Sequence, residues 1–261
     1  MAGNTLIGGT SYEITGGTCL VDGTSYEVKR GKVLIGGTSY DISFGTTIGD
    51  LGVGESVFLN VDGVSNEFII VHQGLPSSLY DSSCNGTWLL MKTVYTWMIW
   101  DPTNNDYANS DIYAYLNNTF LYLLDSDIRA AIQRIKIPYW NGTKSSGTIA
   151  TGSNGLSTRI FLLSGYELGW TTSNSPYFPV DGAKLSYFMS GTTNTANAKR
   201  VAKDQSGSTD TWGLRSPHSG TKDIWAVDRT GAYTVPECAI STAVRPALVL
   251  PSDFDVTNYL A

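Results

Sequence analysis

A short motif occurs three times within the first fifty residues of the chain. It reads LIGGTSYEI from Leu6, LVDGTSYEV from Leu20 and LIGGTSYDI from Leu34, with a period of 14 residues. Each copy joins a short apolar stretch to an alternating one, in which Thr, Tyr and Ile or Val share one face. The Gly-Gly or Asp-Gly pair between the two stretches tolerates the positive φ angles of a two-residue turn. Each copy is therefore predicted to be a β-hairpin.

Further turn residues separate the copies, so the three hairpins are predicted to form a meander or a stacked solenoid. A two-stranded hairpin is marginally stable in water and needs a neighbouring layer, from its own chain or from identical chains. We therefore expect residues 1–50 to serve in assembly or attachment. The alternative is an N-terminal sheet that packs on its own domain. Residues 51–64 are expected to connect this part to a second domain, residues 65–261.

Helical patterns appear only in the second part of the chain. Apolar residues recur at helical spacing over 109–124, and Ser110 or Asp111 is suited to cap this helix. A second helix is predicted over 125–135, with Asp125 or Ser126 as its cap and Pro138 beyond its end.

A strand over 159–163 is predicted to run into a short helix, which a capping box of Ser164 and Glu167 would open. The remaining sequence reads as strands and loops. The fold class expected for the larger domain is thus α+β.

The charge balance excludes two kinds of partner. There are 17 Lys and Arg against 23 Asp and Glu, a net charge of −6, so no nucleic acid or anionic membrane is expected to bind. No apolar run is long enough to span a bilayer, which takes about 18 residues, so no membrane insertion is expected. The start, MAGNTLIGG, lacks a secretion signal, and we expect synthesis in the cytoplasm.

Catalytic and metal-binding patterns are sparse. The chain has only two histidines, of which His72 is expected to be a hydrogen-bonded structural residue and His218 a possible ligand contact. No known catalytic or cofactor motif occurs, so no catalytic residue, metal or cofactor is predicted. The stretch 101–107 lacks the twelve-residue calcium loop and its closing Glu. Five acids are taken as surface residues: Asp101, Asp106, Asp223, Asp228 and Glu237.

The three cysteines have neither zinc-site spacing nor an even number. They are interpreted as small buried hydrophobic residues, although one pair could form a disulfide. The three are Cys19, Cys84 and Cys238.

Two definite motifs frame a stretch without chemical pattern. WGLRSP occupies 212–217 and VRPALVL occupies 244–250. Together with YANSDIYAYLNNTFLYLLDSDIRAAI and RIFLLSGYELG, in that order, they resemble a widespread bacterial and phage domain of unknown function. That domain usually ends in WWLRSP followed by GVRPAL, so Gly213 and Ala243 depart from the pattern. The stretch EFIIVHQGLPSSLYDSSCNGTWLLMK also looks like the opening of forms from phages and prophages of Gram-positive gut bacteria.

The resembled family, matched over about 65–252, is similar to the C-type-lectin-like fold of formylglycine-generating enzymes and of variable proteins diversified by retroelements. In the latter, a fixed scaffold holds a C-terminal region whose exposed residues change from copy to copy. The resemblance implies that Trp212, Arg215 and Arg245 are scaffold, and that the residues between the motifs contact a ligand. The expected contacts are Gly213, His218, Ser219, Thr221, Lys222, Asp223, Trp225, Asp228, Arg229, Tyr233, Glu237 and Ser241.

Aromatic and charged residues set among small ones are typical of binding surfaces, which supports this hypothesis independently. For Trp225 the alternative is a place in the core of a sheet. The activities of the fold do not carry over. Its enzymes hold a metal with paired cysteines, and its calcium-dependent lectins use motifs that VPEC and WAVD match poorly.

The resemblance thus implies a phage virion protein, associated with the tail tip or a fibre. Its C-type-lectin-like domain would bind a bacterial surface glycan or protein, and the hairpins would dock to other virion proteins. A homo-oligomer, for which a trimer is the prediction, is expected from display at high copy number. Two alternatives stay open: a head decoration protein with an adhesive domain, and an enzyme that degrades cell-wall glycans.

Overall fold

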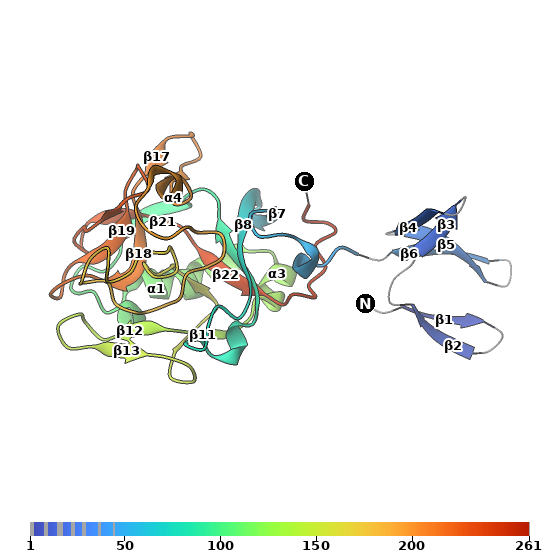
Figure 1. Cartoon of the computed structure of the whole chain (residues 1–261), viewed down its shortest axis with the longest axis horizontal. Coiled ribbons are helices and arrows are strands. Elements are labelled where there is room, and N and C mark those ends of the chain that lie inside the picture. The colour runs from blue at the N-terminus through green and yellow to red at the C-terminus, as the bar shows by residue number, and fades with distance from the viewer. Residues whose placement is uncertain are drawn as a thin grey trace.

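The computed structural model describes residues 45–260 and, before them, the backbone of six strands (Figure 1). The six form three separate antiparallel pairs, and each pair corresponds to one copy of the repeat, as predicted. The predicted Gly-Gly and Asp-Gly turns, and the side chain of Cys19, lie outside the described residues. The pairs are β1 (Gly3–Ile7) with β2 (Thr10–Ile14), β3 (Thr18–Val21) with β4 (Thr24–Glu27), and β5 (Arg30–Ile35) with β6 (Thr38–Ser43).

The larger part of the chain is built on two five-stranded sheets. The first, called here the large sheet, has the order β15-β22-β9-β8-β7 with every neighbouring pair antiparallel. Its strands are β7 (Ser56–Val61), β8 (Val64–Gly74), β9 (Gly86–Met91), β15 (Ile160–Phe161) and β22 (Ala247–Leu250).

The second sheet, called here the small sheet, has the order β10-β21-β18-β19-β20. Only β18 and β21 pair in parallel. Its strands are β10 (Thr96–Ile99), β18 (Trp212–Pro217), β19 (Ile224–Val227), β20 (Tyr233–Thr234) and β21 (Ser241–Val244). The first motif is therefore β18 of the small sheet, whereas the second motif begins with Val244, the last residue of β21, and continues into the large sheet as β22.

Short ribbons and turns complete the fold. Three two-stranded ribbons are β11 (Ile135–Ile137) with β14 (Leu156–Thr158), β12 (Tyr139–Asn141) with β13 (Thr148–Ala150), and β16 (Ala202–Lys203) with β17 (Thr209–Asp210). The short helical turns are η1 (Ile48–Asp50), η2 (Ser82–Cys84), η3 (Tyr107–Asn109) and α4 (Asn194–Ala198). The larger domain therefore belongs to the α+β class, as expected.

Residues 51–64 do more than connect two domains. They include β7, which pairs along its whole length with β8. Val57 and Leu59 of β7 are fully buried in the core, as is Ile48 before them. This segment therefore contributes an edge strand to the large sheet, and the alternating pattern of SVFLNV explains why it does so.

The first predicted helix is present as one helical run. It consists of α1 (Asp111–Tyr115), the π-helix η4 (Leu116–Phe120) and α2 (Leu121–Leu123). Ser110 is its cap, because its hydroxyl accepts a hydrogen bond from the backbone N–H of Tyr113 at 3.3 Å.

The second helix, α3 (Ser126–Ala131), is shorter than the predicted 125–135. The chain leaves the helix at Ile132, and the N–H of Gln133 then donates to the carbonyl of Val249 in β22. Ile135 consequently lies in β11. Tertiary pairing with the sheet has overridden the helical pattern.

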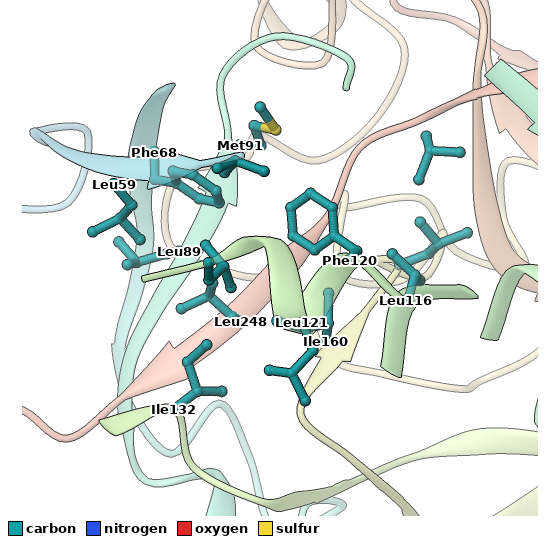
Figure 2. Close-up of a cluster of buried hydrophobic side chains, with 14 of the residues drawn as sticks. Leu59, Phe68, Leu89, Met91, Leu116, Phe120, Leu121, Ile132, Ile160 and Leu248 are labelled. Carbon is teal, nitrogen blue, oxygen red and sulfur yellow. The ribbon is translucent and has the colours of Figure 1, made fainter. Parts of the chain in front are cut away.

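The central strands separate two hydrophobic clusters. All six residues of β9 are buried, with Leu89 and Met91 on one face and Trp88 and Leu90 on the other. On the first face they pack against the helical run and α3, and Figure 2 shows Leu89, Met91 and Phe120 in this cluster. On the second face, Trp88 and Leu90 belong to an aromatic cluster with Trp170, Phe178, Trp212 and Trp225. Burying each such side chain stabilises the fold by roughly 1.5–3 kcal/mol.

Candidate binding face

The chain between the two motifs becomes exposed only after β18, because all six residues of that strand are buried. The loop 218–223 follows, and it is closed by a hydrogen bond from the N–H of His218 to the carbonyl of Asp223 at 2.9 Å. Thr221 and Lys222 at its tip are exposed, whereas His218, Ser219 and Asp223 are half-buried. The loop therefore presents polar side chains from a closed backbone.

His218 is held among polar and aromatic neighbours. Its Nδ1 lies 2.8 Å from the hydroxyl of Ser219 and 4.0 Å from the carboxylate of Asp223. Its ring meets Trp225 edge-on at 4.6 Å and lies 5.2 Å from the ring of Tyr177. Burial lowers the pKa of His218, and the nearby carboxylate of Asp223 opposes this shift. The neutral imidazole, which both donates and accepts one hydrogen bond, therefore predominates at pH 7.

A second loop lies against the first. Cys238, which is buried, donates its backbone N–H to the carbonyl of Lys222 at 2.6 Å. Asp223 and Glu237 form an antiparallel bridge. These contacts bring the exposed Glu237 beside the first loop. We call the resulting surface the binding face and define it as His218, Ser219, Thr221, Lys222, Asp223 and Glu237.

Four predicted contacts lie outside the binding face. Asp228, Arg229 and Tyr233 are at the other end of β19, whose four residues span about 13 Å. The Asp228 carboxylate accepts hydrogen bonds within its own turn, Arg229 pairs with Asp210 at 3.6 Å, and the Tyr233 hydroxyl donates to a backbone carbonyl. Ser241 is exposed at the start of β21.

Two predicted contacts are buried, and these expectations are corrected here. Trp225 is 1% exposed and its ring stacks on Phe178 at 3.7 Å, so it belongs to the core of the small sheet, the alternative considered above. Gly213 is also buried, and a Cβ atom there would lie 2.9 Å from the hydroxyl of Thr242. Neither residue can touch a ligand at the surface, because the strands that carry them are covered on both faces.

Arg215 has the contacts expected of a scaffold residue. It is buried and forms a two-pronged ion pair with Glu167, at 2.6 and 2.7 Å. Its remaining N–H groups donate to the carbonyls of Pro138, Leu162 and Asp181. Burial lowers the pKa of Arg215, but the carboxylate of Glu167 outweighs that effect and raises it overall.

Arg245 and Trp212 pack together at the second motif. The guanidinium of Arg245 lies 4.9 Å from the ring centre of Trp212. It donates to the carbonyls of Met91 and Lys92, at 2.8 and 3.2 Å. The indole N–H of Trp212 donates to the carbonyl of Arg200 at 3.0 Å. These bonds tie the small sheet to the end of β9.

Sequence reasoning placed Glu167 in a local capping box and missed its main role. The two reciprocal bonds with Ser164 are present, at 2.8 and 3.2 Å, but turns follow them in place of the predicted helix. The carboxylate also accepts a hydrogen bond from the hydroxyl of Tyr80 at 2.8 Å, besides pairing with Arg215. Glu167 thus links the turn at Ser164 to Tyr80 and Arg215, and all four residues are buried.

Asp181 is a buried acid that the sequence did not indicate. One oxygen accepts a hydrogen bond from the hydroxyl of Ser216 at 2.7 Å, and the other has no partner among the described residues. Burial raises the pKa of Asp181 to about 6, against the opposing charge of Arg215. Burial lowers the pKa of Lys144 against the opposing charge of Asp181, and the charge of Lys144 in turn lowers the pKa of His218, which places Lys144 between Asp181 and the binding face.

The other residues considered for chemistry have structural partners. His72 accepts from the backbone N–H of Ser186 at 3.2 Å and lies 2.8 Å from its hydroxyl, which confirms the structural hypothesis. Cys84 and Cys238 are buried and are not joined in a disulfide. Asp101, which was expected at the surface, is instead buried, and its carboxylate accepts hydrogen bonds from Thr103 and Asn104 within its own turn.

The binding face offers hydrogen bonding and charge of both signs. Within residues 45–260 and the strands described before them, no group of three or more His, Cys, Asp or Glu is arranged to hold a metal ion. In the same part of the chain, no helix has the length and apolarity needed to cross a membrane. What the face can do chemically is bind a polar ligand through Lys222, Glu237 and the hydroxyls beside them.

By its architecture, the larger part of the chain is an α+β domain with two sheets and a polar face between two buried motifs. A family model covers residues 85–252, which is well over half of the chain. The chain belongs to that family, described as Domain of unknown function (DUF6273). The matched region runs from the start of β9 to just beyond β22, and so includes both motifs and the binding face. No curated protein and no solved structure matches the chain.

Proposed function

We propose that the larger domain is a binding module that recognises a molecule on a bacterial cell surface through the binding face. The observation that carries the proposal is the contrast between β18, which is buried throughout, and the two polar loops attached to it. A buried strand fixes the loop ends, while the loop tips project side chains that serve no described packing role. Such preorganisation reduces the entropy lost on binding.

The side chains at the centre of the face are available to a ligand. Within the described residues, Thr221, Lys222 and Glu237 make no side-chain hydrogen bond or ion pair. A ligand could therefore bond to them without breaking a protein contact. An ammonium and a carboxylate on two adjoining loops suit a ligand with both donors and acceptors, such as a glycan or a polar protein loop.

The C-type-lectin-like fold is part of this proposal. In favour of it are the two sheets, the helical run, and the parallel pairing of β18 with β21, the two strands on either side of a segment with exposed loops. The resemblance to phage and prophage domains extends the proposal to a virion protein of the tail tip or a fibre. In this view, a retroelement diversifies the segment 212–248, and the exposed loop residues are the positions that tolerate exchange.

The three hairpins support attachment at high copy number. They pair only within themselves among the described strands, so their outer backbone edges are available to a neighbouring chain or another virion protein. Assembly into a homo-oligomer, for which we propose a trimer, would make weak single sites effective through multiplicity.

The test is retention of the purified chain on a panel of Gram-positive bacterial cells. The double variant Lys222→Ala/Glu237→Ala should weaken retention at least tenfold, because it removes both charges of the binding face. Its free energy of unfolding should change by less than about 0.5 kcal/mol, since both side chains are exposed. The matched control is Lys203→Ala/Asp253→Ala, which removes two exposed charges elsewhere and should leave retention unchanged.

Two results would count against the proposal. One is retention by the double variant equal to that of the wild type. The other is release of soluble sugars from cell walls by the wild type, which would favour the enzyme that degrades cell-wall glycans.

A further inference from the structure

A concave site of about 350 Å³ lies between the turn of one hairpin and the end of a helix. Its lining includes Asp62, Asn66, Tyr95, Thr96, Tyr115 and Gln205, and none of them belongs to the binding face. We call this site the tyrosine pocket. Its volume lies at the lower end of the range of about 300–1,000 Å³ for small-molecule sites, so it suits a small ligand.

The pocket is shaped by a rigid turn. Asp62 and Gly63 join β7 to β8 with φ angles of 53° and 73°, the combination of a two-residue turn that matches the twist of the strands. The N–H of Asp62 donates to the carbonyl of Leu123 at 2.8 Å, which attaches the turn to the end of the helical run. The Asp62 carboxylate is exposed at the rim.

Two tyrosines are fixed in the wall of the pocket. The ring of Tyr95 packs edge-on against the buried Phe120 at 4.9 Å. Tyr115 ends α1 and is followed directly by the π-helix, a local irregularity that occurs frequently at functional sites. Both are half-buried, and burial raises the pKa of each. The carboxylate of Asp62 further raises the pKa of Tyr95.

The polar groups around these rings are not used by the protein. Within the described residues, no side-chain hydrogen bond engages the carboxylate of Asp62, the hydroxyls of Tyr95, Thr96 and Tyr115, or the amide of Gln205. Buried Asn66 donates to the carbonyl of Val64 at 2.7 Å, which leaves its own carbonyl oxygen as an acceptor. Donors and acceptors thus converge on one hollow beside two aromatic rings.

We infer that the tyrosine pocket binds a neutral monosaccharide unit. A sugar ring combines an apolar face, which suits aromatic rings, with hydroxyls that both donate and accept hydrogen bonds. The carboxylate of Asp62 disfavours an anionic ligand, and no Lys or Arg lines the pocket to compensate. The inference goes beyond the proposed function, because it assigns a second site that shares no residue with the binding face.

The experiment is titration of the ¹⁵N-labelled full chain with glucose, galactose and N-acetylglucosamine, followed by amide chemical shifts. At least one of these sugars should shift the amides of Asn66, Tyr95 and Tyr115. The variants Asp62→Asn and Tyr115→Phe should each weaken that binding about tenfold, a change of about 1.4 kcal/mol. Asn is well tolerated in this type of turn and Phe keeps the ring, so both variants should fold.

Matched controls separate the pocket from general effects. Asp253→Asn and Tyr122→Phe make the same chemical changes at exposed positions outside the pocket and should bind as the wild type does. The Lys222→Ala/Glu237→Ala variant should also keep sugar binding, so the pocket and the binding face can fail independently. The inference is overturned if no sugar of the panel shifts the three amides, if both pocket variants bind normally, or if glucuronic acid binds as tightly as glucose.

Discussion

The two motifs and the loops between them are neighbours in sequence but differ in how their polar groups are satisfied. We call the first region the frame, which consists of β18, β21 and β22. In the frame, Arg215 is fully buried and every one of its side-chain nitrogens donates to an acceptor. On the binding face, Lys222 is exposed and has no partner among the described residues. An unpaired buried polar group costs about 1–3 kcal/mol, whereas an exposed one is paired by water.

This difference indicates where amino-acid substitutions are tolerated. A substitution in the frame leaves several polar partners unpaired, whereas one at a loop tip changes only the surface. The frame itself is not uniform. Among the described residues Arg245 forms no ion pair, and burial lowers its pKa to about 10, whereas Glu167 holds Arg215 in the charged form.

The largest loss of stability is expected when the buried ion pair between Arg215 of the frame and Glu167 is broken. Glu167→Ala should lower the free energy of unfolding by about 3–5 kcal/mol, because it leaves the charge of Arg215 buried and uncompensated. Urea unfolding followed by tryptophan fluorescence measures this. The control is Glu67→Ala, which breaks the exposed pair with Lys92 and should cost less than about 1 kcal/mol. Similar losses in both variants would remove the distinction between the frame and the surface.

The sequence predicts those parts of the fold that local patterns determine. The hairpin repeats followed from their turn residues, and the helical run from its spacing and the cap at Ser110. The end of α3 and the pairing of Glu167 with Arg215 did not follow, because each depends on residues far along the chain. The same holds for the binding face, where loop residues were predicted but their grouping was not.

Trp225 shows most clearly what sequence patterns alone cannot predict. A tryptophan among small and polar residues is typical of a binding surface and equally of a half-buried sheet. The sequence IWAV does not distinguish the two, because strand β19 is buried on both faces and lacks alternation. Asp181 gave no signal at all, since its partner Ser216 is 35 residues away.

An intermediate loss of stability is expected when Trp225 is replaced, a residue that lies between the frame and the binding face. Trp225→Leu should lower the free energy of unfolding by about 2–3 kcal/mol, since it leaves a cavity against Phe178. Chemical denaturation provides the measurement, and Trp97→Leu is the matched control because Trp97 is 49% exposed. Unchanged stability together with lost cell binding would restore Trp225 as a ligand contact.

The smallest change in stability is expected when Asp181 is replaced, and this change depends on pH. The pKa of Asp181 in the folded chain, about 6, lies above the ordinary value of 3.8, so the folded state holds this proton more tightly than the unfolded state. Its contribution to stability is therefore present at low pH and is lost as the pH rises from about 4 through 6.

Asp181→Asn cannot lose that proton and can still accept the hydrogen bond of Ser216. Relative to the wild type, this variant should gain on the order of 2 kcal/mol in free energy of unfolding between pH 4 and pH 7. Urea unfolding at pH 4, 5, 6 and 7 measures the difference, and Asp253→Asn, at an exposed position, should run parallel to the wild type. A constant difference between Asp181→Asn and the wild type across this range would mean that Asp181 is already ionised at pH 4. Asp181 would then carry its negative charge beside Lys144 at every pH of the series. The electrostatic field that Asp181 produces at the binding face would therefore not change with pH.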